Sequence, residues 1–292
     1  MRKTRADRAF DAFNITVMTL LLLIMLYPLY YIVIASVSEP YDVAMGKVFI
    51  KPSGFTLEAY KNVFENRKIW IGYRNTVLYT LFGTLLNLAL TIPTAYVLSK
   101  RQLMGHAFFS WYFLIPMYFG GGLIPTYMVV KMFGLIDSLW SMVIPGMVSA
   151  WNMFIMRNFF YSIPESLEEA ALIDGANQAQ IMIRVTLPLS KAVLATIGLF
   201  YAVGHWNSWF DAMLYINTST KLPMQNILRN IINSVSDLEA LGSEQFELMD
   251  VKPASTSLRC AVIVITATPI IVVYPFVQKY FVKGVMIGSV KG

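Results

Sequence analysis

The sequence predicts an all-α integral membrane protein, and its composition and hydropathy support this fold class. Apolar residues make up 57% of the 292 residues, against roughly 45–50% in soluble domains. Charged residues make up 14%, where about 25% is usual, and the mean hydropathy is +0.57. This composition excludes a disordered chain and a nucleic-acid-binding module. A disulfide scaffold is excluded as well, because Cys260 is the single cysteine.

Six stretches come close to the length of about 20 apolar residues that a membrane-spanning helix needs. The predicted spans are residues 14–38, 75–98, 107–130, 139–156, 192–216 and 260–277. Every stretch except 192–216 lacks Asp, Glu, Lys and Arg; that one contains His205 and Asp211. The first stretch is expected to be a true span, because no small-residue cleavage site follows it as in a signal peptide. Together the spans predict one transmembrane domain over residues 14–282.

Basic residues orient these spans. The N-terminal tail, residues 1–13, contains Arg2, Lys3, Arg5 and Arg8, and the short loop 99–106 contains Lys100 and Arg101. Short loops rich in Lys and Arg stay in the cytoplasm, so both termini are expected there, including a C-terminal tail over 283–292. The longest external segment is then 217–259.

Proline and glycine residues predict irregular helices within the bundle. Proline interrupts the backbone hydrogen bonds of a helix, so kinks are expected near positions 93, 116, 125, 145, 269 and 275. The triplet Gly120-Gly121-Gly122 allows either close helix packing or a local break.

The cytoplasmic segment 162–188 predicts a helix–turn–helix outside the membrane. Pro164 followed by Glu165 suits a helix start. Gly175 is placed to end this helix with a positive φ angle. Asn177 and Gln180 form a capping-box pattern that opens a second short helix, which Pro188 is expected to stop.

The same segment resembles the EAA signature of the permease subunits of binding-protein-dependent ABC importers. The resemblance rests on Glu169-Ala170-Ala171, Gly175, Val185 and Leu187-Pro188 at the family's spacing, with Val185 where isoleucine is usual. It implies that an ATPase subunit docks on Glu168, Glu169, Ala170, Ala171, Asp174, Gly175, Leu187 and Pro188. The C-terminal residues 288–292 resemble the tail of the maltose-type small permease subunit. This implies that Ser289, Val290 and Lys291 contact the ATPase dimer.

This resemblance implies the type I importer permease fold and one half of a transport pathway. Its partners would be a second homologous permease, two ATP-binding subunits and an extracellular solute-binding protein, in a bacterial cytoplasmic membrane. The chain contains no G-x-x-x-x-G-K-[ST] sequence, so we expect no catalytic residue, metal site or cofactor of its own. ATP and Mg²⁺ would be used by the partner ATPases. The external segment 217–259 is expected to dock the binding protein.

The fifth predicted span contains the candidate substrate path. Tyr201, His205 and Trp209 repeat every four residues, and Asn207 and Asp211 form a second stripe beside Trp206. Aromatic faces stack on sugar rings and polar side chains bind hydroxyls, so the pattern favours a carbohydrate path. The alternative is an interfacial aromatic belt with hydrogen bonds between helices.

The overall likeness is to maltose-type permeases that serve complex oligosaccharides or polysaccharide fragments. A permease of the same class for a non-sugar solute, and a secondary transporter, are the alternatives. A secondary transporter would not need the EAA segment, and twelve spans or inverted repeats would be commoner. An intramembrane enzyme is a third class, but the chain has no G-x-S-x-G sequence.

Overall fold

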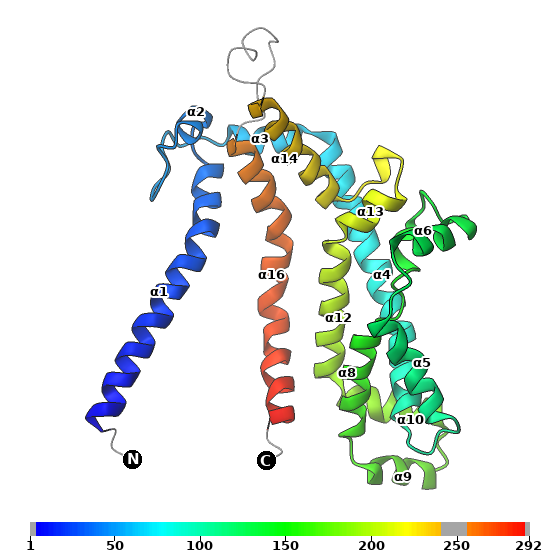
Figure 1. Cartoon of the computed structure of the whole chain (residues 1–292). Helices are drawn as coiled ribbons and strands as arrows, with labels where there is room; N and C mark the ends of the chain where they lie inside the picture. Colours follow the sequence, from blue (N-terminus) through cyan, green and yellow to red (C-terminus); the bar gives the residue numbers. More distant parts are fainter. Residues whose placement is uncertain (1–3, 241–255, 290–292) are drawn as a thin grey trace. The chain divides into compact units, whose positions relative to one another are not determined.

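A computed structural model describes residues 4–240 and 256–289, and this part of the chain is helical and contains no β-strand (Figure 1). An isolated antiparallel bridge joins Ser38 and Phe55. The chain divides into two compact units, Met1–Ile69 with Leu228–Thr268, and Trp70–Ile227 with Pro269–Gly292.

The first unit begins with α1, Arg5–Ser36, followed by the short helices α2, Pro40–Ala44, and α3, Glu58–Glu65. The helix starts at Arg5, inside the segment predicted as the N-terminal tail, 1–13. The reason is local: Thr4 and Asp7 form a capping box, with backbone–side-chain hydrogen bonds of 3.2 and 2.8 Å. Cys260 is buried in the core of this unit with Ile34 and Val43.

The second unit is built largely on α4, Arg67–Ser99. It continues through the following elements: α5, His106–Tyr118; α6, Leu123–Met132; α7, Leu139–Val143; α8, Ala150–Tyr161; α9, Glu165–Ile173; α10, Gln178–Ile181; η1, Met182–Thr186; α11, Leu187–Leu189; α12, Lys191–Trp206; α13, Trp209–Tyr215; and η2, Ser219–Lys221. α14, Met224–Ala240, and α16, Thr256–Ser289, contribute to both units.

By length and composition, three described helices could cross a membrane: Asp7–Ser36, Arg67–Ser99 and Thr256–Pro275. They correspond to the first, second and sixth predicted spans. Two bent helix pairs raise the number to five if each pair counts as one span. α5 and α6 are one such pair, bent by 115°. Of the two interpretations of the glycine triplet between them, the local break is confirmed, and Gly122 has a φ of 86°.

The fourth predicted span, 139–156, is wrong as a single helix. α7 ends at Val143 and α8 begins at Ala150, where the Ser149 side chain caps the helix by accepting from Asn152 N. The break frees backbone carbonyls in an apolar region, where an unpaired carbonyl is costly. Buried Asn87 of α4 satisfies two of them, because its Nδ2 donates to the oxygens of Gly146 and Met147 at 2.7 and 2.9 Å.

The segment predicted as the C-terminal tail, 283–292, is helical in its first part, because α16 continues through Ser289. Val290 and Lys291, predicted to contact an ATPase, lie outside the described residues.

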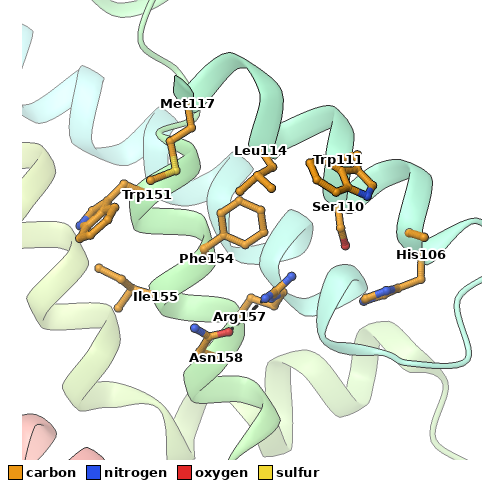
Figure 2. Close-up of a pocket in the computed structure, with 11 residues that line it drawn as sticks. His106, Ser110, Trp111, Leu114, Met117, Trp151, Phe154, Ile155, Arg157 and Asn158 are labelled. Carbon is orange, nitrogen blue, oxygen red and sulfur yellow. Dashed lines mark hydrogen bonds between the residues drawn. The ribbon is translucent and has the colours of Figure 1, made fainter. Parts of the chain in front are cut away.

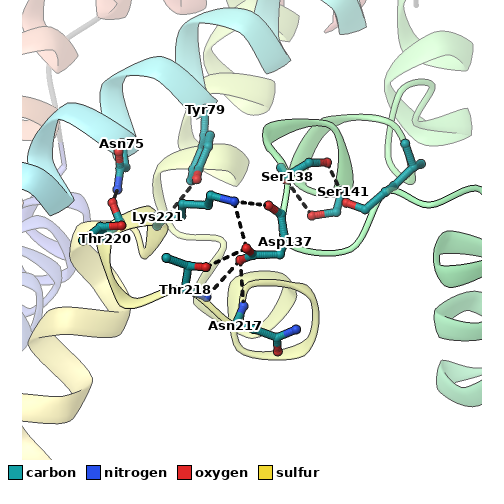
Figure 3. A network of polar contacts seen from close by, with 10 residues as sticks. Asn75, Tyr79, Asp137, Ser138, Ser141, Asn217, Thr218, Thr220 and Lys221 are labelled. Carbon is teal, nitrogen blue, oxygen red and sulfur yellow. Dashed lines mark hydrogen bonds and ion pairs between the residues drawn. The ribbon is translucent and has the colours of Figure 1, made fainter.

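Asp137 joins two loops of the second unit (Figure 3). Its backbone has a φ of 58°, which Asp tolerates better than most residues. Its carboxylate accepts from the backbone nitrogens of Asn217 and Thr218 and from the Thr218 hydroxyl, at 3.0, 2.9 and 2.6 Å. Lys221 pairs with it at 2.8 Å and also donates to its carbonyl oxygen. Because Tyr79 of α4 donates to the Lys221 oxygen at 2.7 Å, the network anchors the loop 217–221 to that helix.

Asp137→Asn is expected to lower the unfolding temperature of the purified protein at neutral pH, because Asn cannot pair with Lys221. The hydrogen bonds from Lys221 and Thr218 hold the pKa of Asp137 well below its usual range. The stabilisation is therefore complete above the unfolded pKa of about 3.9 and decreases as the pH falls through the folded pKa. Thermal unfolding of both proteins at several pH values measures this. An Asp137→Asn protein as stable as the wild type at neutral pH would contradict the assignment.

Candidate functional site

The segment that resembles the EAA signature folds as the predicted helix–turn–helix (Figure 1). α9 ends in a hydrogen-bonded turn in which Gly175 N donates to Leu172 O at 3.0 Å and Ala176 N donates to Ala171 O at 2.9 Å. Gly175 has a φ of 81°, so the prediction of a positive φ angle is confirmed. This pair of bonds satisfies carbonyls at the helix end. The predicted capping box between Asn177 and Gln180 is also confirmed, and it starts α10.

The predicted coupling residues form an accessible surface. No residue of α9 is buried. The exposed members are Glu169, Ala170, Asp174, Gly175 and Pro188, and the half-buried ones are Glu168, Ala171 and Leu187. Small side chains on a projecting helix permit a close approach by another chain, so the geometry is compatible with docking. Their contact with an ATPase stays a prediction.

Two contacts join this segment to the end of α4. Lys100 forms an ion pair with Glu168, and Tyr96 Oη donates to Gln178 Oε1 at 2.8 Å. Lys100 Nζ also lies 4.3 Å from the centroid of the Tyr96 ring. These residues line a cavity of about 450 Å³ together with Glu169. From the sequence, Lys100 served only to predict which loops are cytoplasmic. Neighbouring residues give no sign of its ion-pair partner, which lies 68 positions away.

The second helix ends at Leu189, one residue after the predicted stop at Pro188. Helical structure continues through α10, η1 and α11 to Leu189, and α12 follows after a bend of 86°. η1 is a π-helix over Met182–Thr186. A proline inside an α-helix clashes with the carbonyl four residues earlier, and a wider π turn relieves such a clash. The segment that resembles the EAA signature therefore continues into α12 through a single bend.

A polar cavity of about 460 Å³ lies against α12. Tyr201, His205 and Asp211, three of the predicted path residues, line it. α12 also supplies Phe200, and other parts of the unit supply the remaining wall, which includes Asn87, Thr126, Ser141, Ser149, Asn152, Ser208 and Tyr215. The lining contains hydroxyls, amides, a carboxylate and aromatic rings, and it contains no Lys or Arg.

Hydrogen bonds fix two of these side chains. Tyr201 Oη lies 2.8 Å from Thr91 Oγ1 and accepts from Ser149 N at 3.1 Å. His205 Nε2 lies 2.7 Å from Asn87 Oδ1. Because Asn87 uses its amide nitrogen for the two carbonyls at the α7–α8 break, its oxygen must accept, and His205 Nε2 therefore donates.

Close backbone approach places His205 against α4. An added Cβ at Gly83 would overlap the imidazole ring of His205, so a larger residue there would displace that ring. His205 therefore links α12 both to α4 and, through Asn87, to the α7–α8 break.

The predicted stripe of Tyr201, His205 and Trp209 is not one continuous helix face. α12 ends at Trp206, and Trp209 begins α13 after a break at Asn207 and Ser208. The helix ends here because the Ser208 hydroxyl donates to His205 O and Asn207 Nδ2 donates to Val203 O. Trp209 is 36% exposed and does not line the cavity.

The other two predicted path residues also lie outside this cavity. Trp206 is buried and meets Tyr73 edge-to-face, so it packs between helices, which is neither the predicted path position nor the interfacial belt of the alternative. Asn207 accepts from Gln225 Nε2 at 3.1 Å. The sequence analysis did not identify Asn87 as a site residue. The feature that could have indicated it is a polar amide side chain within a predicted span that contains no charged residue. Among the described residues, no group of three or more His, Cys, Asp or Glu could hold a metal ion.

Comparison with known proteins identifies the family. Residues 69–287 match the family described as binding-protein-dependent transport system inner membrane component. The chain is 41% identical over 292 residues to protein LplC of Bacillus subtilis, and the alignment covers 100% of this chain and 98% of that protein. It is 40% identical over 266 residues to the polygalacturonan/rhamnogalacturonan transport system permease protein YtcP of the same organism, covering 90% and 91%.

A solved structure supports the same conclusion. One chain of a bacterial ABC transporter involved in the import of the acidic polysaccharide alginate is 36% identical to this chain, with a TM-score of 0.87. The match covers 96% of this chain and 99% of that one. The match over residues 69–287, together with these similarities, shows that the chain belongs to the family of binding-protein-dependent transport system inner membrane components.

Proposed function

We propose that this chain is a permease subunit of an ATP-driven importer and forms, with a second permease, the pathway for an oligosaccharide or polysaccharide fragment. The observation that carries the proposal is the direct connection between two sites. α10, η1 and α11 run from the EAA turn into α12, whose far end lines the polar cavity. A displacement at the turn can thus reach the cavity wall through consecutive helical elements of the chain.

Relatives and cavity chemistry support the carbohydrate assignment. YtcP is described as a polygalacturonan/rhamnogalacturonan permease, and the structural relative is involved in alginate import. The cavity offers what neutral parts of a sugar need: aromatic faces for C–H contacts, and amide, carboxylate and imidazole groups for hydroxyls. Because its lining contains no Lys or Arg, this subunit would bind sugar hydroxyls, and any sugar carboxylate would require a cation from elsewhere.

The proposed mechanism is alternating access. ATP binding closes two partner ATPase subunits, which dock on the exposed EAA residues and hold the ATP and Mg²⁺; this chain needs no cofactor. The external segment 217–259, of which α14 is described to Ala240, would receive the binding protein. Ser289, Val290 and Lys291 would extend toward the ATPases. This arrangement puts both termini in the cytoplasm.

His205→Leu is expected to reduce ATP-dependent uptake of oligosaccharide by about tenfold. Leucine keeps an apolar volume but leaves the buried Asn87 oxygen without its donor, a loss of about 1–3 kcal/mol. It also removes the imidazole from the cavity wall. Uptake by proteoliposomes containing the complete importer and its binding protein measures the effect.

Thr196→Val is the matched control. Thr196 lies on the same helix, donates only to Ala192 O and does not line the cavity, so its variant should transport at the wild-type rate. Uptake at the wild-type rate by His205→Leu would contradict the proposal. It would mean that His205 only packs helices together and that the partner permease forms the substrate path.

A further inference from the structure

A second cavity, of about 500 Å³, lies between α5 and α8 and is not part of the proposed substrate path (Figure 2). Its walls are mainly aromatic and aliphatic, and each helix supplies one tryptophan. The lining residues are His106, Ala107, Ser110, Trp111, Leu114, Met117, Trp151, Phe154, Ile155, Arg157 and Asn158. Trp111 and Trp151 are 61% and 60% exposed, so the groove opens to the surroundings of this unit.

Arg157 puts a positive charge into this apolar groove. Its guanidinium lies 4.6 Å from the centroid of the Phe154 ring and 5.5 Å from that of Tyr161. Nη2 donates to Asn158 Oδ1 at 3.2 Å. Within residues 4–240 and 256–289, no carboxylate forms an ion pair with Arg157, and neither Arg157 Nε nor Ser110 Oγ has a hydrogen-bond partner. Holding a half-buried cation without a counter-charge costs free energy, so the groove favours an anionic ligand.

The location of the groove restricts the ligand. His106 Nε2 lies 3.1 Å from both Leu98 O and Tyr161 Oη, so the cavity reaches the ends of α4 and α8 that lead to Lys100 and to the EAA segment. Arg157 is therefore near one membrane surface, whereas Leu114, Met117 and Trp151 continue the groove toward the middle of the spans. A ligand with an anionic head and apolar chains fits both parts. Basic pockets between spanning helices bind anionic lipid headgroups in this way.

We propose that this groove binds an anionic phospholipid from the leaflet on the side of the EAA segment. Arg157 binds the phosphate by charge-assisted hydrogen bonds, and the Ser110 hydroxyl is a further donor. Trp111, Leu114 and Trp151 contact the acyl chains. The bound lipid fills the space between α5 and α8 and supplies the missing counter-charge.

The test uses the complete importer in mixed micelles with equal amounts of dioleoyl phosphatidylglycerol and dioleoyl phosphatidylcholine. Native mass spectrometry counts the copies of each lipid that remain bound. The wild type is expected to retain phosphatidylglycerol preferentially, and Arg157→Gln should lower this preference about tenfold, as expected for the loss of one charge-assisted contact. Arg101→Gln is the matched control. Arg101 lies at the same end of α4 but outside the groove, so this variant should keep the preference.

A second variant tests the groove without removing the charge. Ser110→Phe fills the cavity while Arg157 remains, and it should also lower phosphatidylglycerol retention. Unchanged retention in both variants would overturn the proposal. Loss of the second permease from the Arg157→Gln complex would overturn it as well, because the groove would then be a subunit interface.

Discussion

Gly175→Val is expected to abolish ATP-driven uptake while the importer complex still assembles in the membrane. Gly175 has a φ of 81°, and no atom lies within 4 Å of a Cβ built there. A side chain at this position therefore meets no steric obstacle, and the penalty is one of backbone conformation. A β-branched residue is a strong outlier at positive φ, so the turn must rearrange and redirect α9 relative to α10.

A series at this position separates conformation from size. Asn adopts the left-handed region more readily than other residues with a side chain, so Gly175→Asn should retain more uptake than Gly175→Val although both add a side chain. Uptake by proteoliposomes, normalised to the assembled complex on native gels, measures both. Equal uptake by Gly175→Val and the wild type would show that the turn geometry is not needed for coupling.

Lys100→Met is expected to lower uptake about tenfold while the partner ATPases still hydrolyse ATP, so that less sugar is imported for each ATP. Lys100 and Glu168 side chains are only 27% and 21% exposed. Removing one partner therefore costs more than the ~1 kcal/mol of a surface pair and less than the ~3–5 kcal/mol of a buried one. Because the pair joins α9 to the end of α4, its loss lets the coupling helix move without moving the spans. The ratio of sugar molecules imported to ATP hydrolysed measures this.

Two further variants define the role of the ion pair. The double variant Lys100→Glu with Glu168→Lys restores opposite charges and should recover part of the transport ratio. Arg101→Met removes a neighbouring cation that stacks over Tyr161 at 5.6 Å and, in the described part of the chain, forms no ion pair with α9, so it should leave the ratio unchanged. If the Lys100→Met complex imported as much sugar per ATP as the wild type, the ion pair between Lys100 and Glu168 would not be needed for coupling.

Local chemistry allowed part of the site to be predicted from the sequence. The positive φ of Gly175 and the capping box of Asn177 with Gln180 depend on residues within a few positions of one another. Short-range backbone hydrogen bonds decide such turns, so their sequence signals are reliable. The hydropathy of α1, α4 and α16 likewise marked three helices that are long enough to span a membrane.

The breaks within the spans could not be predicted in the same way. Hydropathy reports the transfer of side chains and says little about the backbone between Val143 and Ala150. That interruption is stabilised by Asn87, which lies 59 and 60 positions from the carbonyls it binds. The stripe from Tyr201 to Trp209 failed for a related reason, because periodicity assumes a continuous helix and α12 ends at Trp206.

The most direct test of the transport function is ATP-dependent uptake by proteoliposomes that contain this chain, the second permease, both ATPase subunits and the binding protein. Labelled oligogalacturonate and neutral oligosaccharides serve as substrates, with an amino acid and phosphate for comparison. We predict accumulation of an oligosaccharide only when ATP is enclosed with the ATPase side of the complex and the binding protein is present. Accumulation driven by an ion gradient without ATP, or uptake of the amino acid or phosphate in place of any sugar, would contradict the account.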